Sequence, residues 1–270
     1  MTELQPGQSA TLSAADRDGV LVVTLDRPPA NALNRQIIHD LAVLFAELTE
    51  RRDAPPIVLT GRGERFFSAG GDIKELEGVP ADAIDARMRE FHALLVAIDG
   101  YPRPVVSAIN GHCVGGGMEI ALFSDAVLAV GSARFGFPEI NHGLLPADKG
   151  LQRASRMLGI RATRRIVLSG ELFDAQHALD IGLVDELATD HEALIESAVA
   201  TARSAGAKAP VLYGALKRSI NDQDDARDDI SLQRTLMAAA EYFDDPTARE
   251  LREQWSGRRA SATKENSCPA

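Results

Sequence analysis

The sequence has few of the residues that cross-link a chain or anchor it in a membrane. Its 270 residues include one tryptophan and two cysteines, Cys113 and Cys268, and aromatic residues make up only 5%. Cys268 lies in the polar C-terminal tail, so we expect no structural disulfide, which favours a reducing compartment. The first six residues lack the basic and apolar segments of a signal peptide. No apolar run is long enough to cross a bilayer, so we expect a cytoplasmic protein.

Basic residues are also in deficit. The chain has 29 Lys and Arg residues against 39 Asp and Glu residues, a formal net charge of -10. This balance argues against nucleic acid and anionic membranes as partners. Hydrophobic residues make up 45% of the chain, which is enough for a substantial core without disulfides, in one large domain or a core with a smaller appendage.

Short apolar runs and helical spacings alternate along most of the chain. Strands are predicted at residues 19–25, 57–61, 105–109 and 126–130. Helices are predicted over residues 34–48, with Asn34 as the N-cap, and over residues 80–98. This alternation indicates an α/β core up to about residue 190. The pattern is then helical, with breaks near Pro210 and Pro246, and we expect a loose tail after Gly257.

Two glycine-rich segments follow predicted strands. In the first, Gly70 and Gly71 precede Asp72, and glycines there allow backbone to approach a ligand closely and expose N–H groups. The alternative is a plain turn in which Asp72 caps a short helix. In the second, three glycines from Gly115 precede Met118 and Glu119 at the start of an apolar helix.

Two glutamates lie in apolar surroundings. Glu119 falls in a helix that is apolar on nearly all sides, where a carboxylate is costly unless it is partnered or protonated. Glu139 follows two phenylalanines and a proline. Twenty positions and one predicted strand separate the two, a step that can return the chain to the same site. The alternatives are a locally bonded core Glu119 and a surface-loop Glu139.

In combination, these segments resemble the enoyl-CoA hydratase/isomerase (crotonase) superfamily. The resemblance covers about residues 15–260 and implies a spiral of ββα units followed by a helical trimerisation region. It suggests a division into residues 1–203, the acyl-CoA core, and residues 204–270, the C-terminal helical oligomerisation region, with assembly into a homotrimer or homohexamer. Five segments in matching order carry it: residues 25–33, 67–76, 110–119, 137–140 and 170–185.

The resemblance implies roles for particular residues. Backbone N–H groups of Gly71 and Gly116 would bind the thioester oxygen and stabilise an enolate. Glu139 would donate a proton to the α-carbon, and Glu119 would hold and activate the water that attacks the β-carbon. The implied reaction is addition of water to a 2-enoyl-CoA thioester, in which coenzyme A is part of the substrate and no separate cofactor or metal is needed.

The coenzyme A contacts implied by the resemblance lie around the first loop. The adenine would meet backbone near Ala69, with Asp72 in the same loop. Arg27 and Lys74 are candidates for phosphate or ribose contacts, or else ordinary solvated charges. Met118 is expected to line the acyl pocket.

The sequence departs from the usual hydratase pattern after Glu139. Asp148 and Lys149 stand where glycines are frequent, and the segment partly resembles the dienoyl-CoA isomerase version, in which an acidic residue acts with the catalytic glutamate. The alternative for Asp148 and Lys149 is a surface ion pair. His142 is expected either to donate into the site or to stabilise the loop. Isomerisation, another enolate chemistry such as decarboxylation or hydrolysis, and a binding protein without turnover are therefore alternatives to hydration.

Overall fold

The computed structural model describes residues 11–76, 81–221, 225–243 and 245–265. The strands are β1 (Leu12–Arg17), β2 (Val20–Leu25), β3 (Ile57–Gly61), β4 (Phe66–Ser68), β5 (Val105–Ile109), β6 (His112–Val114), β7 (Ala126–Val130), β8 (Arg134–Gly136), β9 (Phe173–Asp174) and β10 (Glu186–Ala188). The α-helices are α1 (Arg35–Thr49), α2 (Ala81–Gly100), α3 (Gly116–Leu122), α4 (Asp148–Leu158), α5 (Ile160–Ser169), α6 (Ala175–Asp180), α7 (His191–Gly206), α8 (Pro210–Asn221), α9 (Asp225–Phe243) and α10 (Pro246–Glu265). Two 3₁₀ helices, η1 (Ile73–Leu76) and η2 (Pro138–His142), follow the glycine-rich loop and β8.

Two sheets form the centre of the molecule. The larger has the strand order β1-β2-β3-β5-β7-β10 and the smaller the order β4-β6-β8-β9. Neighbouring strands are parallel except for the pairs β1–β2 and β8–β9. Consecutive strands such as β3 and β4, or β5 and β6, divide between the two sheets before a helix follows. This repeated ββα step confirms the predicted α/β fold.

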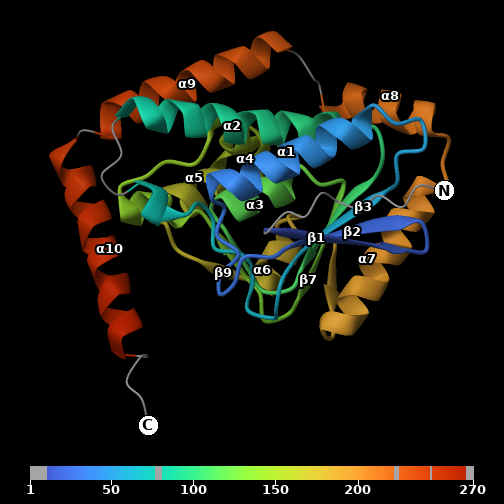
Figure 1. Cartoon of the computed structure of the whole chain (residues 1–270), viewed down its shortest axis with the longest axis horizontal. Coiled ribbons are helices and arrows are strands. Elements are labelled where there is room, and N and C mark those ends of the chain that lie inside the picture. The colour runs from blue at the N-terminus through green and yellow to red at the C-terminus, as the bar shows by residue number, and fades with distance from the viewer. Residues whose placement is uncertain (1–10, 77–80, 222–224, 244, 266–270) are drawn as a thin grey trace.

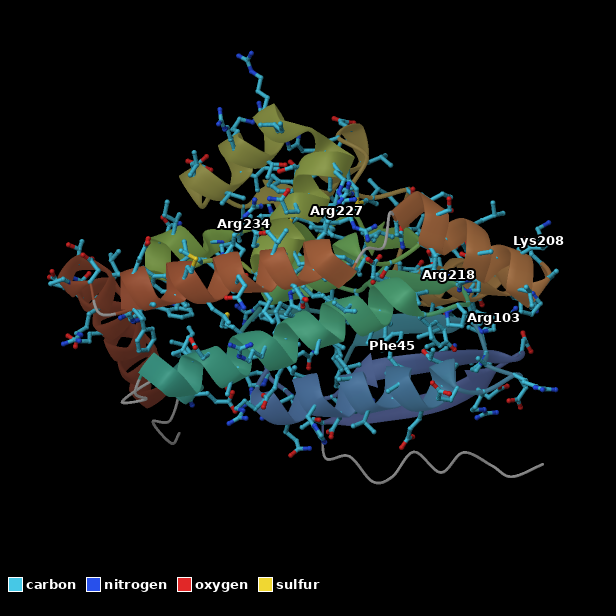
Figure 2. The ribbon with its side chains drawn as sticks, turned by 90° about the horizontal axis from the view of Figure 1, so that it is seen from above. Phe45, Arg103, Lys208, Arg218, Arg227 and Arg234 are labelled. Atoms are coloured by element: carbon cyan, nitrogen blue, oxygen red, sulfur yellow. The ribbon has the colours of Figure 1, made fainter. Side chains whose placement is uncertain are left out.

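Helices cover the sheets on more than one side (Figure 1). Helices α1, α2 and α9 lie side by side in one layer, as the view from above also shows with Phe45 on α1 (Figure 2). Helix α7 packs against the larger sheet at β5 and β7. Helix α10 runs down the edge of the molecule and contacts η2.

The predicted strands and helices appear with small changes of boundary. Burial of β3 and β5 is complete along their lengths, as expected for central parallel strands with both faces covered. Asn34 caps α1, because its side-chain oxygen accepts a hydrogen bond from the N–H of Ile37 at 3.0 Å. The expected loose tail after Gly257 is wrong for its first part, since α10 continues to Glu265.

Strands β4, β6 and β8 were not predicted. Each has three residues, too few for a period of two to stand out in a sequence. They nevertheless make up most of the second sheet, and each lies directly before a loop that contributes to the cavity described below. No helix in the described parts of the chain combines the length and apolarity needed to cross a membrane.

Candidate active site

The first glycine-rich loop lines a cavity and leaves the N–H of Gly71 outside its bridge to Leu33. Leu33 forms an isolated parallel bridge with Gly71. The N–H of Leu33 donates to the Gly70 carbonyl at 2.8 Å, and the N–H of Asp72 donates to the Leu33 carbonyl at 3.0 Å. In a parallel bridge these bonds reach the residues on either side, so the N–H of Gly71 itself points away from Leu33. Gly71 lines the cavity.

The second glycine-rich segment packs backbone to backbone against the first. Gly116 is the first residue of α3, so its N–H is one of those that the helix leaves unpaired. A Cβ on Gly70 would lie 3.4 Å from the nitrogen of Gly116 and 3.0 Å from the Val114 carbonyl oxygen. Gly115 has φ +55° and ψ -129°, a conformation that suits glycine alone. Small residues therefore bring Gly71 and Gly116 to the wall of the same cavity.

The cavity has a volume of about 270 Å³. Aliphatic and aromatic side chains provide most of its walls, and its polar groups come from both glycine segments, two glutamates, an arginine, a histidine, a tyrosine and a tryptophan. The lining residues are Leu33, Ile38, Ala69, Gly70, Gly71, Ile84, Arg87, Met88, Phe91, Val114, Gly115, Gly116, Glu119, Pro138, Glu139, His142, Leu144, Leu145, Ala147, Leu172, Tyr242 and Trp255.

Glu119 is a buried carboxyl group in the cavity wall, 2% exposed. Its Oε1 accepts a hydrogen bond from the N–H of Ala147 at 2.9 Å. Burial, and secondly the charge of Glu139, raise the pKa of Glu119 well above its usual value, and the Ala147 bond opposes this. A Cβ on Gly150 would overlap Oε1 of Glu119, so the glycine in α4 makes room for this carboxyl group.

Glu139 lies opposite the second glycine segment, at the start of η2. A Cβ on Gly115 would lie 2.5 Å from Oε1 of Glu139. The other oxygen, Oε2, is buried and has no hydrogen-bond partner among the described residues. Burial raises the pKa of Glu139 to about 7. A buried oxygen without a partner is costly in a folded protein, so this atom is poised to accept or donate a bond to a ligand.

The two glutamates thus share one cavity and have raised pKa values. Burial favours the neutral form of each carboxyl group, and the charge of Glu139 further disfavours ionisation of Glu119, so the pair is expected to share one proton, which suits proton transfer to and from a bound molecule. The structure brings both carboxyl groups to one cavity, so Glu139 is not a surface-loop residue. Glu119 accepts a backbone hydrogen bond in the core, as its alternative anticipated, and it also lines the cavity.

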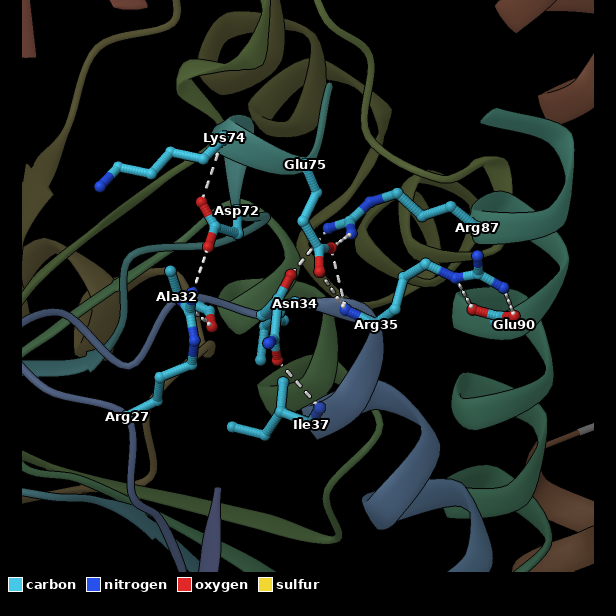
Figure 3. A network of polar contacts seen from close by, with 11 residues as sticks. Arg27, Ala32, Asn34, Arg35, Ile37, Asp72, Lys74, Glu75, Arg87 and Glu90 are labelled. Atoms are coloured by element: carbon cyan, nitrogen blue, oxygen red, sulfur yellow. Dashed lines mark hydrogen bonds and ion pairs between the residues drawn. The ribbon is translucent and has the colours of Figure 1, made fainter. Parts of the chain in front are cut away.

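A polar network borders the first loop (Figure 3). Arg87 on α2 donates to Oε2 of Glu75 at 2.6 Å and to the Leu33 carbonyl at 2.7 Å. Glu75 also accepts the N–H of Arg35 at 2.9 Å, and the Arg35 side chain pairs with Glu90. Burial lowers the pKa of Arg87, and Glu75 opposes that effect. The network ties the loop after Gly71 to α1 and α2.

The residues expected to contact coenzyme A fall into two groups. Ala69 lines the cavity, and its N–H donates to the Ala30 carbonyl at 2.9 Å. Asp72 is buried and pairs with Arg27 at 2.5 Å, and neither lines the cavity. Asp72 also accepts the N–H of Lys74, as the N-cap alternative anticipated. Lys74 is exposed and extends away from the Glu75–Arg87 pair (Figure 3).

Two expected site residues lie elsewhere. Met118 is fully buried in the hydrophobic core and is absent from the cavity wall, because the side of α3 that carries it faces the protein interior. Asp148 is also outside this cavity. Its Oδ2 accepts a hydrogen bond from the hydroxyl of Ser231 at 2.9 Å, and its backbone N–H donates to the hydroxyl of Thr235. These two bonds join the start of α4 to α9.

The expected surface ion pair between Asp148 and Lys149 is not formed. Lys149 is 9% exposed and pairs instead with Asp228 at 2.5 Å and Asp99 at 3.6 Å. Successive residues of a helix point about 100° apart, so Lys149 lies between Asp228 of α9 and Asp99 of α2, whereas Asp148 faces Ser231 of α9.

His142 lies at the cavity beside a residue from the far end of the chain. Its ring stacks on Trp255 of α10, with centroids 4.0 Å apart and an interplanar angle of 13°. Both residues line the cavity. This contact favours the loop-stabilising role of His142 over direct donation into the site.

Among the cavity-lining residues with a side chain that can hydrogen-bond, three were not predicted as site residues: Arg87, Tyr242 and Trp255. Arg87 carries a signal that was available, because it falls within the apolar helical stripe of Ile84, Met88 and Phe91. A charge inside such a stripe indicates a buried, partnered group. Tyr242 and Trp255 carry no comparable signal, since only the folding back of α9 and α10 brings them here.

Comparison with known proteins places this chain in a family. The family described as enoyl-CoA hydratase/isomerase matches residues 15–264. The chain belongs to the enoyl-CoA hydratase/isomerase family. A probable enoyl-CoA hydratase of Bacillus subtilis is 32% identical over 240 residues, which are 88% of this chain and 93% of that protein. The probable enoyl-CoA hydratase EchA17 of Mycobacterium tuberculosis is 34% identical over 204 residues, 76% of this chain and 77% of that protein.

Solved structures agree with the family. An enoyl-CoA hydratase/isomerase of Mycobacterium paratuberculosis superposes with a TM-score of 0.81 at 28% identity, covering 90% of this chain and 98% of that one. A carnitinyl-CoA hydratase of Mycobacterium avium gives a TM-score of 0.79 at 29% identity, covering 92% and 96%. The predicted crotonase-type fold is therefore confirmed, and the chain is an enzyme of this family.

Proposed function

We propose that the protein is an enoyl-CoA hydratase, which adds water across the 2,3-double bond of a 2-enoyl-CoA thioester. The observation that carries this proposal is the pair of buried carboxyl groups, Glu119 and Glu139, with raised pKa values in one cavity. The names of the curated relatives support it. In this proposal coenzyme A arrives with the substrate, and no separate cofactor or metal takes part.

The thioester oxygen would bind the N–H groups of Gly71 and Gly116. Addition at the β-carbon places negative charge on that oxygen, and fixed donors stabilise the charge without reorganising. Each donor of this kind typically contributes about 3 kcal/mol to transition-state stabilisation. The close packing of Gly70 against Gly116 supports this pairing of donors.

The two glutamates would divide the proton transfers. With the shared proton on Glu139, ionised Glu119 would hold the attacking water and take its proton, and Glu139 would give its proton to the α-carbon. The neutral form of Glu139 is accessible at neutral pH, because burial raises its pKa to about 7. Proton donation by a group whose pKa lies near the working pH is efficient.

The remaining coenzyme A contacts are proposed for the outer side of the first loop. Ala69 lies at the cavity and would meet the adenine through its backbone. Lys74 is exposed and suits a phosphate contact, whereas Arg27 already pairs with Asp72. Lys74 would therefore be the main phosphate contact from this loop. Arg27 could bind a phosphate only while it also pairs with Asp72.

Double-bond isomerisation is the second candidate, because it also uses an enolate and a carboxyl group. Its dienoyl form needs a further acid, and Asp148 was the candidate. Asp148 faces Ser231 and Thr235 rather than the cavity, which weighs against that form. Hydration is therefore the reaction that we put forward for test.

Loss of the thioester ultraviolet absorbance of crotonyl-CoA measures hydration directly. Glu139→Gln and Glu119→Gln should each lower kcat by at least about a hundredfold, because general acid–base groups contribute about that much or more. Glu186→Gln, an exposed glutamate on β10, is the matched control and should keep the parent rate. A parent rate in Glu139→Gln would refute the assignment.

The chain's division and assembly are also proposed. Residues 1–203 would form the acyl-CoA core and residues 204–270 the oligomerisation region of a homotrimer or homohexamer. Tyr242 and Trp255 line the cavity, so the second region would also complete the site.

A further inference from the structure

Arg87 places a cation in the wall of a largely apolar cavity. It lies on α2 among Ile84, Met88 and Phe91, which line the same cavity, and it is 6% exposed. Of the described cavity-lining residues, it is the one with an arginine or lysine side chain. Burial of a charge without enough partners is costly, so such a residue is expected to have further acceptors.

The protein provides acceptors for only some of the N–H groups of the Arg87 side chain. Glu75 takes one N–H of Nη1 and the Leu33 carbonyl takes one of Nη2. A guanidinium has five N–H groups in a planar fork, so the two bonds fix its position and leave further donors for another acceptor. Because Glu75 is itself held by the N–H of Arg35, the guanidinium is anchored from the loop side (Figure 3).

The guanidinium also lies close to the first glycine-rich loop. A Cβ on Gly71 would be 3.1 Å from its Nη2. An acyl group whose thioester oxygen binds at Gly71 therefore has Arg87 within a few carbon atoms of its carbonyl. Apolar walls formed by Met88, Phe91 and Leu145 surround the same space and would exclude water from the contact.

We propose that Arg87 is a specificity residue that selects acyl groups carrying an acceptor oxygen, a ketone or a carboxylate, about four or five carbons along the chain. The inference rests on the proposed acyl-CoA site and adds a substrate class to it. Three basic side chains near this site already have an acidic partner, in the pairs Arg87–Glu75, Arg35–Glu90 and Arg27–Asp72, so the net charge of these pairs is zero. The ligand therefore needs an oxygen that accepts a hydrogen bond, as both a ketone and a carboxylate have. The experiment below distinguishes the neutral ketone from the anionic carboxylate.

A purely structural role for Arg87 makes a different prediction. The Leu33 carbonyl that accepts from Arg87 also accepts the N–H of Asp72, so Arg87 helps to hold the first loop. If that were its whole role, replacing Arg87 would weaken the binding of all acyl-CoA thioesters by the same factor. The ratio between matched ligands therefore distinguishes selection from positioning.

The test is calorimetric binding of three saturated thioesters with the same heavy-atom skeleton: 5-methylhexanoyl-CoA, 5-oxohexanoyl-CoA and glutaryl-CoA. A series one carbon shorter (4-methylpentanoyl, 4-oxopentanoyl and succinyl thioesters) is run alongside it. In the parent, at least one oxygenated ligand should bind tenfold or more tightly than its branched counterpart, as expected for a hydrogen bond to a charged donor. Arg87→Met should abolish this preference.

Arg35→Met is the matched control. It removes an arginine from the same network, but the Arg35 side chain is half exposed and lies outside the cavity, so the ratio should stay as in the parent. If Arg87→Met does not fold, Arg87→Lys replaces it, since lysine keeps the charge and loses the planar fork. It should reduce the preference at least threefold.

Three results overturn the inference. The first is a parent that binds the branched ligands as tightly as the oxygenated ones. The second is a ratio of oxygenated to branched affinities that is unchanged in the Arg87 variants. The third is a loss of affinity in those variants that is equal for all ligands. None of the ligands has a double bond, so the result does not depend on hydration. Failure of the parent to bind any thioester would refute the acyl-CoA site as well, whereas tight binding without preference refutes the role of Arg87 alone.

Discussion

At the scale of single residues, Gly150 controls the position of a carboxyl group. Its Cα lies against Glu119, and a Cβ there would overlap the carboxyl group. Gly150→Ala should displace Glu119, lower the hydration rate at least tenfold and reduce the free energy of unfolding by about 1–3 kcal/mol, as overpacked interiors do. Crotonyl-CoA turnover and urea unfolding measure the two effects.

Gly131→Ala is the control for that substitution. Gly131 has no atom within 4 Å of a Cβ, and it does not adopt a left-handed conformation. Its alanine variant should match the parent in rate and stability. An unaltered rate in Gly150→Ala would show that Glu119 moves freely or is not needed.

The raised pKa of Glu139 makes stability depend on pH. Its native pKa of about 7 exceeds the ordinary value of 4.5, so the native state binds more protons than the unfolded state between those values. The stabilisation is therefore complete below about pH 4.5 and is lost as the pH rises through 7. Relative to Glu139→Gln, which does not titrate, the parent should lose up to about 3 kcal/mol over this range.

Urea unfolding of both proteins at pH 5 and pH 8 measures that difference directly. Titrating groups other than Glu119, whose pKa depends partly on the charge of Glu139, are common to the two proteins and largely cancel in the comparison. An equal stability difference at both pH values would show that the Glu139 carboxyl is solvated rather than buried.

At the scale of secondary-structure elements, α10 closes one side of the cavity. Arg252 is buried and donates to the carbonyls of Gly143 and Phe243, which joins α10 to the loop after η2 and to the end of α9. Trp255, three residues further along, stacks on His142 at the cavity. Helix α10 therefore contributes both a wall and the contact that holds it in place.

Arg252→Met should leave those carbonyls without their charged donor and lower the free energy of unfolding by about 1–3 kcal/mol. Hydrogen exchange should increase in α10 and at Leu144, and the KM for crotonyl-CoA should rise more than kcat falls. Gln254→Ala, an exposed position whose side chain bonds within α10, should change none of these. Equal protection in both variants would indicate that other contacts hold α10.

At the scale of the whole molecule, α8 exposes an apolar face. Val211, Leu212, Leu216 and Ile220 are 63–82% exposed, and the last three follow one another at helical spacing of four. Exposed apolar patches of this kind commonly mark protein interfaces. They suit the proposed contact between copies of this chain.

Leu216→Glu combined with Ile220→Glu should shift the protein from a trimer or hexamer toward the monomer in light scattering after size-exclusion chromatography. A charge buried at an interface is costly, which is the reason for the shift. Val43→Glu, on the exposed side of α1, is the control and should keep the parent mass. A monomeric parent would refute the proposed assembly.

Sequence reasoning succeeded where a signal is local. The strands at residues 57–61 and 105–109 are continuous apolar runs, and the Asn34 cap stands just before an apolar stripe, so near neighbours in the chain decide them. The glycine segments, Glu119 and Glu139 were recognisable because their order and spacing match a known family. Arg87 was within reach as a charge inside an apolar stripe.

The sequence by itself determined the fold class, the family and the two carboxyl groups, because apolar periodicity and motif spacing are properties of neighbouring residues. Only the tertiary structure decided which side chains face the cavity. Met118 points into the core and Asp148 points toward α9, because neighbouring residues on a helix differ in direction by about 100°. It also placed Tyr242 and Trp255 in the same cavity as Glu119, although more than a hundred residues separate them from it in the sequence. Helix packing brings such distant segments together, and no local sequence pattern predicts that contact.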